Sequence, residues 1–126
     1  MVERGSPQGI AAGLEQIVEN TRSELMETID QFQELCFIVT PERGVSKEII
    51  TDIRQTYKQI QDQLSKIRGA KQLLEGRYRQ YYLRDSRRER EIMDIAFLAK
   101  SLDSKFEYIL QEIEAKKRLK GRGDVF

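Results

Sequence analysis

Side chains capable of acid–base or covalent chemistry are few in this 126-residue chain, which has no histidine and a single cysteine, Cys36. A Cys–His nucleophile and a Cys/His zinc site are therefore excluded. The carboxylate pairs Glu89/Glu91 and Glu112/Glu114 are two residues apart, and such side chains point to different sides of a helix. The sequence predicts a protein that is not an enzyme and that binds no metal, cofactor or small-molecule substrate.

A cluster of arginines and tyrosines has the composition of a binding surface, since arginines contact phosphates and aromatic rings stack on bases. However, Tyr78 and Tyr81 also belong to an apolar helix face, and Glu75 and Asp85 dilute the positive charge. We therefore rank nucleic-acid binding last among the interpretations, and favour a charged helix end or a dock for an acidic partner. The arginines are Arg77, Arg79, Arg84, Arg87, Arg88 and Arg90.

Two short motifs lie near the C-terminus. Arg122-Gly123-Asp124 is the integrin-ligand tripeptide, which we interpret as chance because no secretion signal is evident. The basic residues 116–122 resemble a short nuclear-localisation patch, but helix C-capping explains the same residues and is the favoured interpretation. No apolar run approaches the ~18 residues of a membrane span. We expect an intracellular protein, in the nucleus or, as the alternative, the cytoplasm.

The elements that position these side chains are helices, because apolar residues recur in alternating steps of three and four. This seam is stable only against another helix, so it predicts a helix over about 46–84 whose seam binds a partner. Only Lys71 interrupts it. Lys71 either restricts the register in which the two helices pair, or packs its aliphatic stem in the seam while its amine reaches water. The seam contains Ile50, Ile53, Tyr57, Ile60, Leu64, Ile67, Leu74, Tyr78 and Tyr81.

Before the seam, a broader apolar stripe predicts a first helix over about 9–38, preceded by a disordered segment 1–8. The two helices are separated by a short turn that contains Pro41 and Gly44, with Ser46 as the expected N-cap of the second helix. A loop this short favours antiparallel neighbours.

After the seam, Ser86-x-x-Glu89 matches a capping box and predicts a third helix over about 86–119. The heptad frame nevertheless continues unchanged through Asp85, which would fit one kinked helix of about 70 residues. Both alternatives remain open, with the break slightly favoured. Residues 120–126 are expected to form a basic flexible tail, with Gly121 ending the helix.

The third segment also carries apolar residues outside the seam. Phe97 and Tyr108 fall at heptad positions f and c, which face away from a simple coiled coil. Either this helix is central in the chain's own bundle, or a partner subunit covers the surface; the second is favoured. The additional partner-binding residues predicted here are Met93, Phe97, Leu98, Tyr108 and Leu110.

The order of these elements resembles that of the Mediator complex subunit 30 family, helical head-module subunits of the transcription coactivator. The similar stretches, within about 19–113, are ENTRSELMETIDQFQEL, the TPERGV turn, TDIRQTYKQIQDQLSKIRGAKQLLEGRYRQYY and SRREREIMDIAFLAKSLDSKFEYILQEI. The chain lacks the long loop that this family has before its last helix. The resemblance implies a nuclear, non-enzymatic scaffold subunit that acts in RNA polymerase II transcription.

These patterns predict an all-α fold, an elongated antiparallel helical hairpin or three-helix coiled-coil bundle, with one helical domain over 9–119. We expect a scaffold subunit whose partners are other helical subunits, a hetero-oligomer being favoured over a homodimer. The alternatives are a subunit of another intracellular assembly (a kinetochore, tethering or organelle-positioning complex) and a self-assembling homo-oligomer. An arginine-dependent nucleic-acid binder is a third class.

Overall fold

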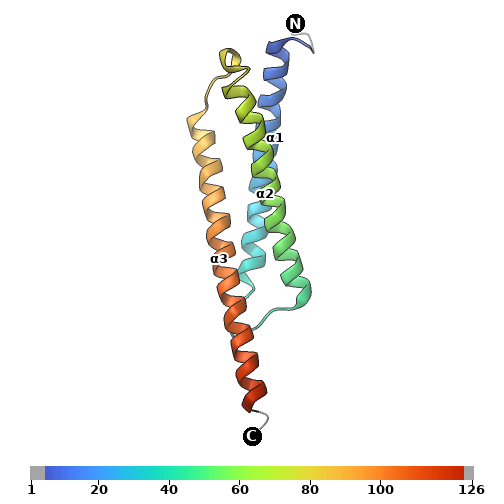
Figure 1. Cartoon of the computed structure of the whole chain (residues 1–126), viewed down its shortest axis with the longest axis vertical. Coiled ribbons are helices and arrows are strands. Elements are labelled where there is room, and N and C mark those ends of the chain that lie inside the picture. The colour runs from blue at the N-terminus through green and yellow to red at the C-terminus, as the bar shows by residue number, and fades with distance from the viewer. Residues whose placement is uncertain (1–4, 124–126) are drawn as a thin grey trace.

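Three long helices run down, up and down again, as seen in Figure 1, in the computed structural model, which describes residues 5–123 and the side chains of residues 5–119. Helix α1 spans Pro7–Phe37, α2 spans Lys47–Glu75, a short 3₁₀ turn η1 spans Arg79–Tyr81, and α3 spans Ser86–Gly123. Within residues 5–123 there is no strand. The all-α fold with antiparallel hairpin packing is confirmed.

The first two helices begin at side-chain caps. The Ser6 hydroxyl accepts the Gly9 N–H at 3.0 Å, and the Ser46 hydroxyl accepts the Ile49 N–H at 3.2 Å, so the predicted cap at Ser46 is confirmed. In the turn between them, Gly44 has φ of +72°, a conformation that glycine adopts without steric cost. Helix α1 already includes residues 7 and 8, so predicted disorder there is wrong; residues 1–4 lie outside the described part.

Helix α2 ends nine residues before the predicted boundary of 84, which is therefore wrong. Gly76 is the C-cap, and a Cβ there would lie 3.1 Å from the Gln72 carbonyl oxygen. The N–H groups of Gly76 and Tyr78 donate to the carbonyls of Gln72 and Leu73, both at 3.0 Å, and close the helix end. Tyr78 lies in this turn, outside the helix, and its side chain is still buried in the core. The heptad pattern therefore continues although the helix does not.

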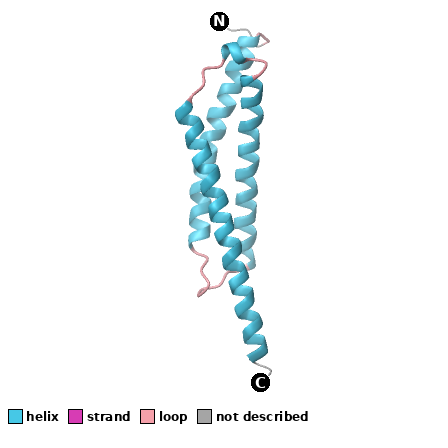
Figure 2. Cartoon of the chain, turned by 60° about the vertical axis from the view of Figure 1, so that its left-hand side comes forward, coloured by secondary structure: helices cyan, strands magenta, loops and turns pink. Residues whose placement is uncertain are grey.

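The predicted break before the third helix is present, but its cap differs. The Asp85 carboxylate accepts the Arg88 N–H at 3.0 Å, and Glu89 pairs with side chains instead of closing a capping box at Ser86. Helix α3 continues through Gly121 to residue 123, so the predicted tail is wrong for residues 120–123, and residues 124–126 lie outside the described part. The last turns of α3 project beyond the α1–α2 turn (Figures 1 and 2).

The core lies mainly between α1 and α2. Four fully buried side chains, Val18, Leu25, Ile53 and Ile60, come from facing stripes of the two helices. One polar pair lies among them, since the buried Gln63 amide donates to the Thr28 hydroxyl at 3.0 Å. Helix α3 adds a smaller set of buried residues: Ala99, Phe106, Leu110 and Ile113.

Candidate helix-docking surface

Most of the seam predicted to bind a partner is filled by the chain itself. The prediction of partner binding is wrong for the five seam residues that are at most 9% exposed: Ile53, Ile60, Ile67, Leu74 and Tyr78. They pack in the intramolecular core because α1 presents a complementary stripe. Ile50, Tyr57 and Leu64 are only partly buried against that core, and Tyr81 is 39% exposed.

On α3, the structure separates the predicted residues into two groups. Leu110 is buried, so the prediction that it binds a partner is wrong. Leu98 is partly buried against the core, so less of its surface is accessible to a partner. Met93, Phe97 and Tyr108 remain 70%, 75% and 62% exposed. We call these three side chains the α3 outer row. Exposed large apolar groups on one helix face are typical of contact surfaces.

A shallow groove separates α2 from α3 beside this row. It consists of two cavities of about 440 and 390 Å³ that share Leu64, Arg68 and Ala96 in their walls. Tyr57 lies at one end, and Met93 of the outer row lines the other. We call this feature the α2/α3 groove. Five of the predicted partner-binding residues line it: Tyr57, Ile60, Leu64, Ile67 and Met93. Ile60 and Ile67 are buried, so Tyr57, Leu64 and Met93 supply its accessible surface.

The charges along the groove are unevenly neutralised. Lys71 contacts Glu89 of α3 at 3.4 Å and Glu75 at 4.0 Å, so its amine joins α2 to α3. Arg68 on α2 and Lys100 on α3 also line the groove, and neither forms an ion pair within residues 5–119. The middle of the groove therefore carries uncompensated positive charge.

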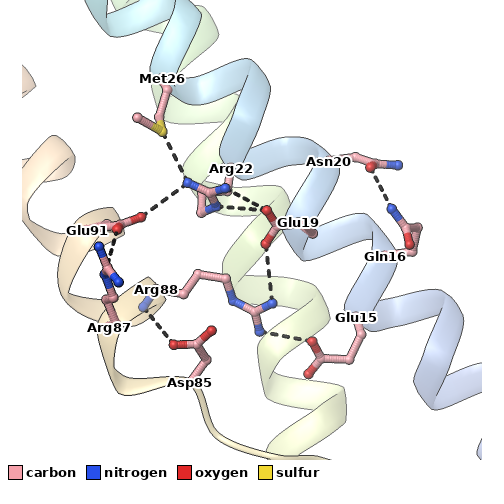
Figure 3. A network of polar contacts seen from close by, with 10 residues as sticks. All are labelled: Glu15, Gln16, Glu19, Asn20, Arg22, Met26, Asp85, Arg87, Arg88 and Glu91. Atoms are coloured by element: carbon pink, nitrogen blue, oxygen red, sulfur yellow. Dashed lines mark hydrogen bonds and ion pairs between the residues drawn. The ribbon is translucent and has the colours of Figure 1, made fainter.

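One member of the arginine cluster, Arg88, attaches α3 to α1 (Figure 3). The Arg88 side chain is 11% exposed and contacts Glu15 at 3.0 Å and Glu19 at 3.6 Å. Arg22 extends this network by contacting Glu19 at 2.6 Å and Glu91 at 3.2 Å. We call these five residues the α1/α3 clamp. It explains why the charged Arg88 occupies a core position of the heptad frame.

The remaining arginines divide into engaged and free side chains. Arg84 contacts Glu89 at 2.8 Å, Arg87 contacts Glu91 at 3.7 Å, and the Arg77 guanidinium lies 5.9 Å from the Tyr78 ring centre. Arg79 and Arg90 form no ion pair among the described side chains. Internal ion pairs thus occupy much of the surface considered for an acidic partner, although its role toward a partner stays a prediction.

Electrostatic shifts follow from these contacts. The hydrogen bond from Arg22 lowers the pKa of Glu19, against the opposing effect of partial burial. Burial raises the pKa of Glu89, but hydrogen bonds from Arg84 and Lys71 outweigh it, so the net shift is downward. Burial, together with Asp103, raises the pKa of the Cys36 thiol to about 11. That thiol is therefore protonated and a poor nucleophile at neutral pH.

Two features of this surface were not predicted. Phe37 is 86% exposed at the end of α1, beside a cavity of about 450 Å³ bounded by the α1–α2 turn and α3. The wall cations Arg68 and Lys100 were also missed. Arg68 falls at heptad position e, which flanks the seam and gave a usable signal. Lys100 falls at position b, on the outer side, and nothing in the pattern marked it or Phe37.

Comparisons with known proteins found no matching protein-family model, curated protein or solved structure. Among the described residues, no helix combines the length and the apolar composition needed to cross a membrane. Fold and surface together define the class: a three-helix bundle with an exposed apolar row beside an unfilled interhelical groove.

Proposed function

We propose that this protein is a non-enzymatic scaffold subunit that binds helices of partner subunits on the side formed by α2 and α3. One observation carries the proposal: Met93 and Phe97 are 70% and 75% exposed beside a groove with a partly apolar floor. Amphipathic helices commonly dock in such grooves through apolar side chains spaced three or four residues apart.

The energetic argument is that α3 leaves apolar surface in water that a partner helix would cover. Burying a large apolar side chain contributes about 1.5–3 kcal/mol. Met93 and Phe97 lie one helical turn apart, so one partner helix can contact both. Tyr108 extends the same row toward the projecting end of α3, where a second contact would lengthen the interface.

The complex that we propose is Mediator, with a role in RNA polymerase II transcription. The support is the resemblance in element order over residues 19–113. The exposed basic residues Lys116, Lys117 and Arg118 favour a nuclear location, as in a nuclear-localisation patch. The alternative is another intracellular assembly built from helical subunits.

Affinity capture from nuclear extract, followed by mass spectrometry, tests both the surface and the complex. We expect the tagged chain to recover Mediator subunits, and M93S/F97S to lose them. The matched control is Leu83→Ser, because Leu83 is 89% exposed in the segment between η1 and α3. Recovery of no Mediator subunit rejects that complex. If M93S/F97S still captures the same subunits, the proposed binding surface is wrong.

A second candidate is self-association, which the composition of the outer face of α3 favours. Six consecutive c and f positions are uncharged and exposed: Phe97, Ser101, Ser104, Tyr108, Gln111 and Ala115. In an antiparallel pair of copies, Phe97 would face Tyr108 of the second copy, and Lys100 would lie near its Glu107. Sedimentation of the isolated chain decides: a dimer that Phe97→Ser dissociates supports this candidate, and a monomer excludes it.

A further inference from the structure

The α2/α3 groove has the shape of a site for a fourth helix. Its floor is formed by partly buried side chains that already pack against the core, including Tyr57, Leu64 and Ile92. Ala96 and Ala99 supply short side chains on the α3 wall, which leaves room above them. An added helix would therefore complete a four-helix arrangement, a common architecture for helices of this length.

The length of the groove sets the size of its occupant. From Tyr57 to Glu75 the lining spans 19 helical residues, whose 18 steps of 1.5 Å give a length of about 27 Å. A partner helix of about five turns would fit. It would place four or five apolar residues, at spacings of three and four, against the floor.

The charges on the walls set the chemistry of that helix. At one end of the groove Lys71 is neutralised within the chain by its pair with Glu89, and about one turn beyond Tyr57 at the other end Arg54 pairs with Glu107 at 3.7 Å. In the middle, Arg68 and Lys100 line the groove from opposite helices, and neither forms an ion pair with any acidic side chain between residues 5 and 119. Residues that flank an apolar stripe on a docked helix would lie beside these two cations.

We infer that the α2/α3 groove binds an amphipathic helix whose apolar stripe is flanked on both sides by acidic residues. This inference rests on the proposed function and specifies the chemistry of the partner. A helix with basic flanks is disfavoured, because it would place like charges against Arg68 and Lys100.

Binding of two designed peptides to the full chain tests the inference. Both are 18-residue helices with the same leucine stripe, one flanked by glutamate and the other by lysine, and fluorescence anisotropy measures their affinities. We expect the glutamate peptide to bind about tenfold more tightly, because two surface ion pairs replace two repulsions. The preference should shrink in 0.5 M salt, where screening is strong.

Variants then locate the effect. R68E/K100E should reverse the preference in favour of the lysine peptide. The control K66E/K117E makes the same change in net charge at exposed positions outside the groove, and should retain the wild-type preference. Ala96→Leu fills the shared wall of both cavities and should weaken both peptides. Since these positions are not fully buried, circular dichroism should show an unchanged fold for every variant.

Several results would overturn the inference. Equal affinity for the two peptides, or a preference that R68E/K100E leaves unchanged, removes the charge argument. If the isolated chain forms a dimer and the dimer binds neither peptide, the groove is occupied by a second copy of the chain and not by an acidic helix. If neither peptide binds while the nuclear-extract partners are still captured and still lost with M93S/F97S, the inference fails and the proposed function stands.

Discussion

The two faces of α2 are covered to very different extents. Toward α1, the side chains of Ile53 and Ile60 are fully buried against an unbroken stripe that includes Leu25 and Phe32. Toward α3, Leu64 is only partly covered, as is the Tyr57 ring, which stacks on Phe32 of α1 with 5.6 Å between ring centres, and a cavity lies beside both residues. One face of α2 is therefore closed by packing, whereas the other is a groove.

Helix α3 is attached by a different kind of contact at each end. Near its N-terminus the ion pairs of Arg88 and Glu91 join it to α1, while Phe106 and Ile113 pack into the core toward its C-terminus. Ion pairs fix orientation but contribute little free energy when exposed, whereas apolar packing contributes more. The α1–α2 hairpin is thus the stable unit, and α3 leaves the surface on which a partner can bind.

The largest expected effect comes from the closed interface. Leu25→Ala should lower the free energy of unfolding by about 3 kcal/mol, because it removes a fully buried side chain and leaves a cavity. Urea denaturation measures the change. Phe97→Ala is the matched substitution on the open side and should change stability by less than about 0.5 kcal/mol. Equal losses for the two variants would contradict the comparison.

The α1/α3 clamp should give the next largest effect. Arg88→Met keeps most of the side-chain length but leaves Glu15 without its cation and removes one of the two cations beside Glu19, at a cost of about 1–2 kcal/mol. Amide hydrogen exchange should show faster exchange in the first turns of α3 and unchanged exchange in α1 and α2. Arg90→Met is the control, since Arg90 is exposed and outside the clamp. Uniform acceleration across all helices would show that the hairpin is not independent.

The helix ends could be predicted only where the sequence contains a cap or a helix-breaking residue. Caps and breakers act over a few residues, so Ser46, Pro41 and Gly44 located the first turn correctly. The end of α2 was missed because Tyr78 fills a core position from a turn. A side-chain pattern reports which residues are buried, and a helix is only one way to bury them. Gly76 was the signal that should have carried more weight.

The candidate site was predictable only in part, for a different physical reason. An apolar seam shows that a helix covers it, but not whether that helix belongs to the same chain. Ile60 and Ile67 were therefore assigned to a partner although α1 covers them. Phe97 and Tyr108 were assigned from positions opposite the seam, and these side chains are exposed. The groove itself depends on how α3 packs on α2, which one-dimensional spacing does not specify.

Acid should weaken the attachment of α3. The folded-state pKa values of Glu19 and Glu89 lie below the ordinary value of 4.5, so the folded chain binds fewer protons than the unfolded chain near that pH. The stabilisation is present above about pH 4.5 and is lost as the pH falls through the lowered pKa values. Asp103 opposes this, because burial, followed by the Glu107 charge, raises its pKa.

The measurement is the melting temperature between pH 6 and pH 3. We expect it to fall with acid in the wild type and to fall less in E19Q/E89Q. Glu24→Gln, on the exposed face of α1, should follow the wild type. If the double variant retained the full pH dependence, other carboxylates would have to account for it.

The smallest effect is expected at the polar pair inside the closed interface. The buried Gln63 amide donates to the Thr28 hydroxyl, but the Gln63 carbonyl oxygen has no partner among the described residues. Gln63→Leu should therefore leave the free energy of unfolding unchanged or raise it by up to about 1 kcal/mol. The Thr28 hydroxyl still donates to the Glu24 carbonyl at 2.8 Å, so no donor is left unpaired. Urea denaturation measures this change as well. A loss above about 1 kcal/mol would mean that the hydrogen bond, and not apolar packing alone, sets the alignment of α1 on α2.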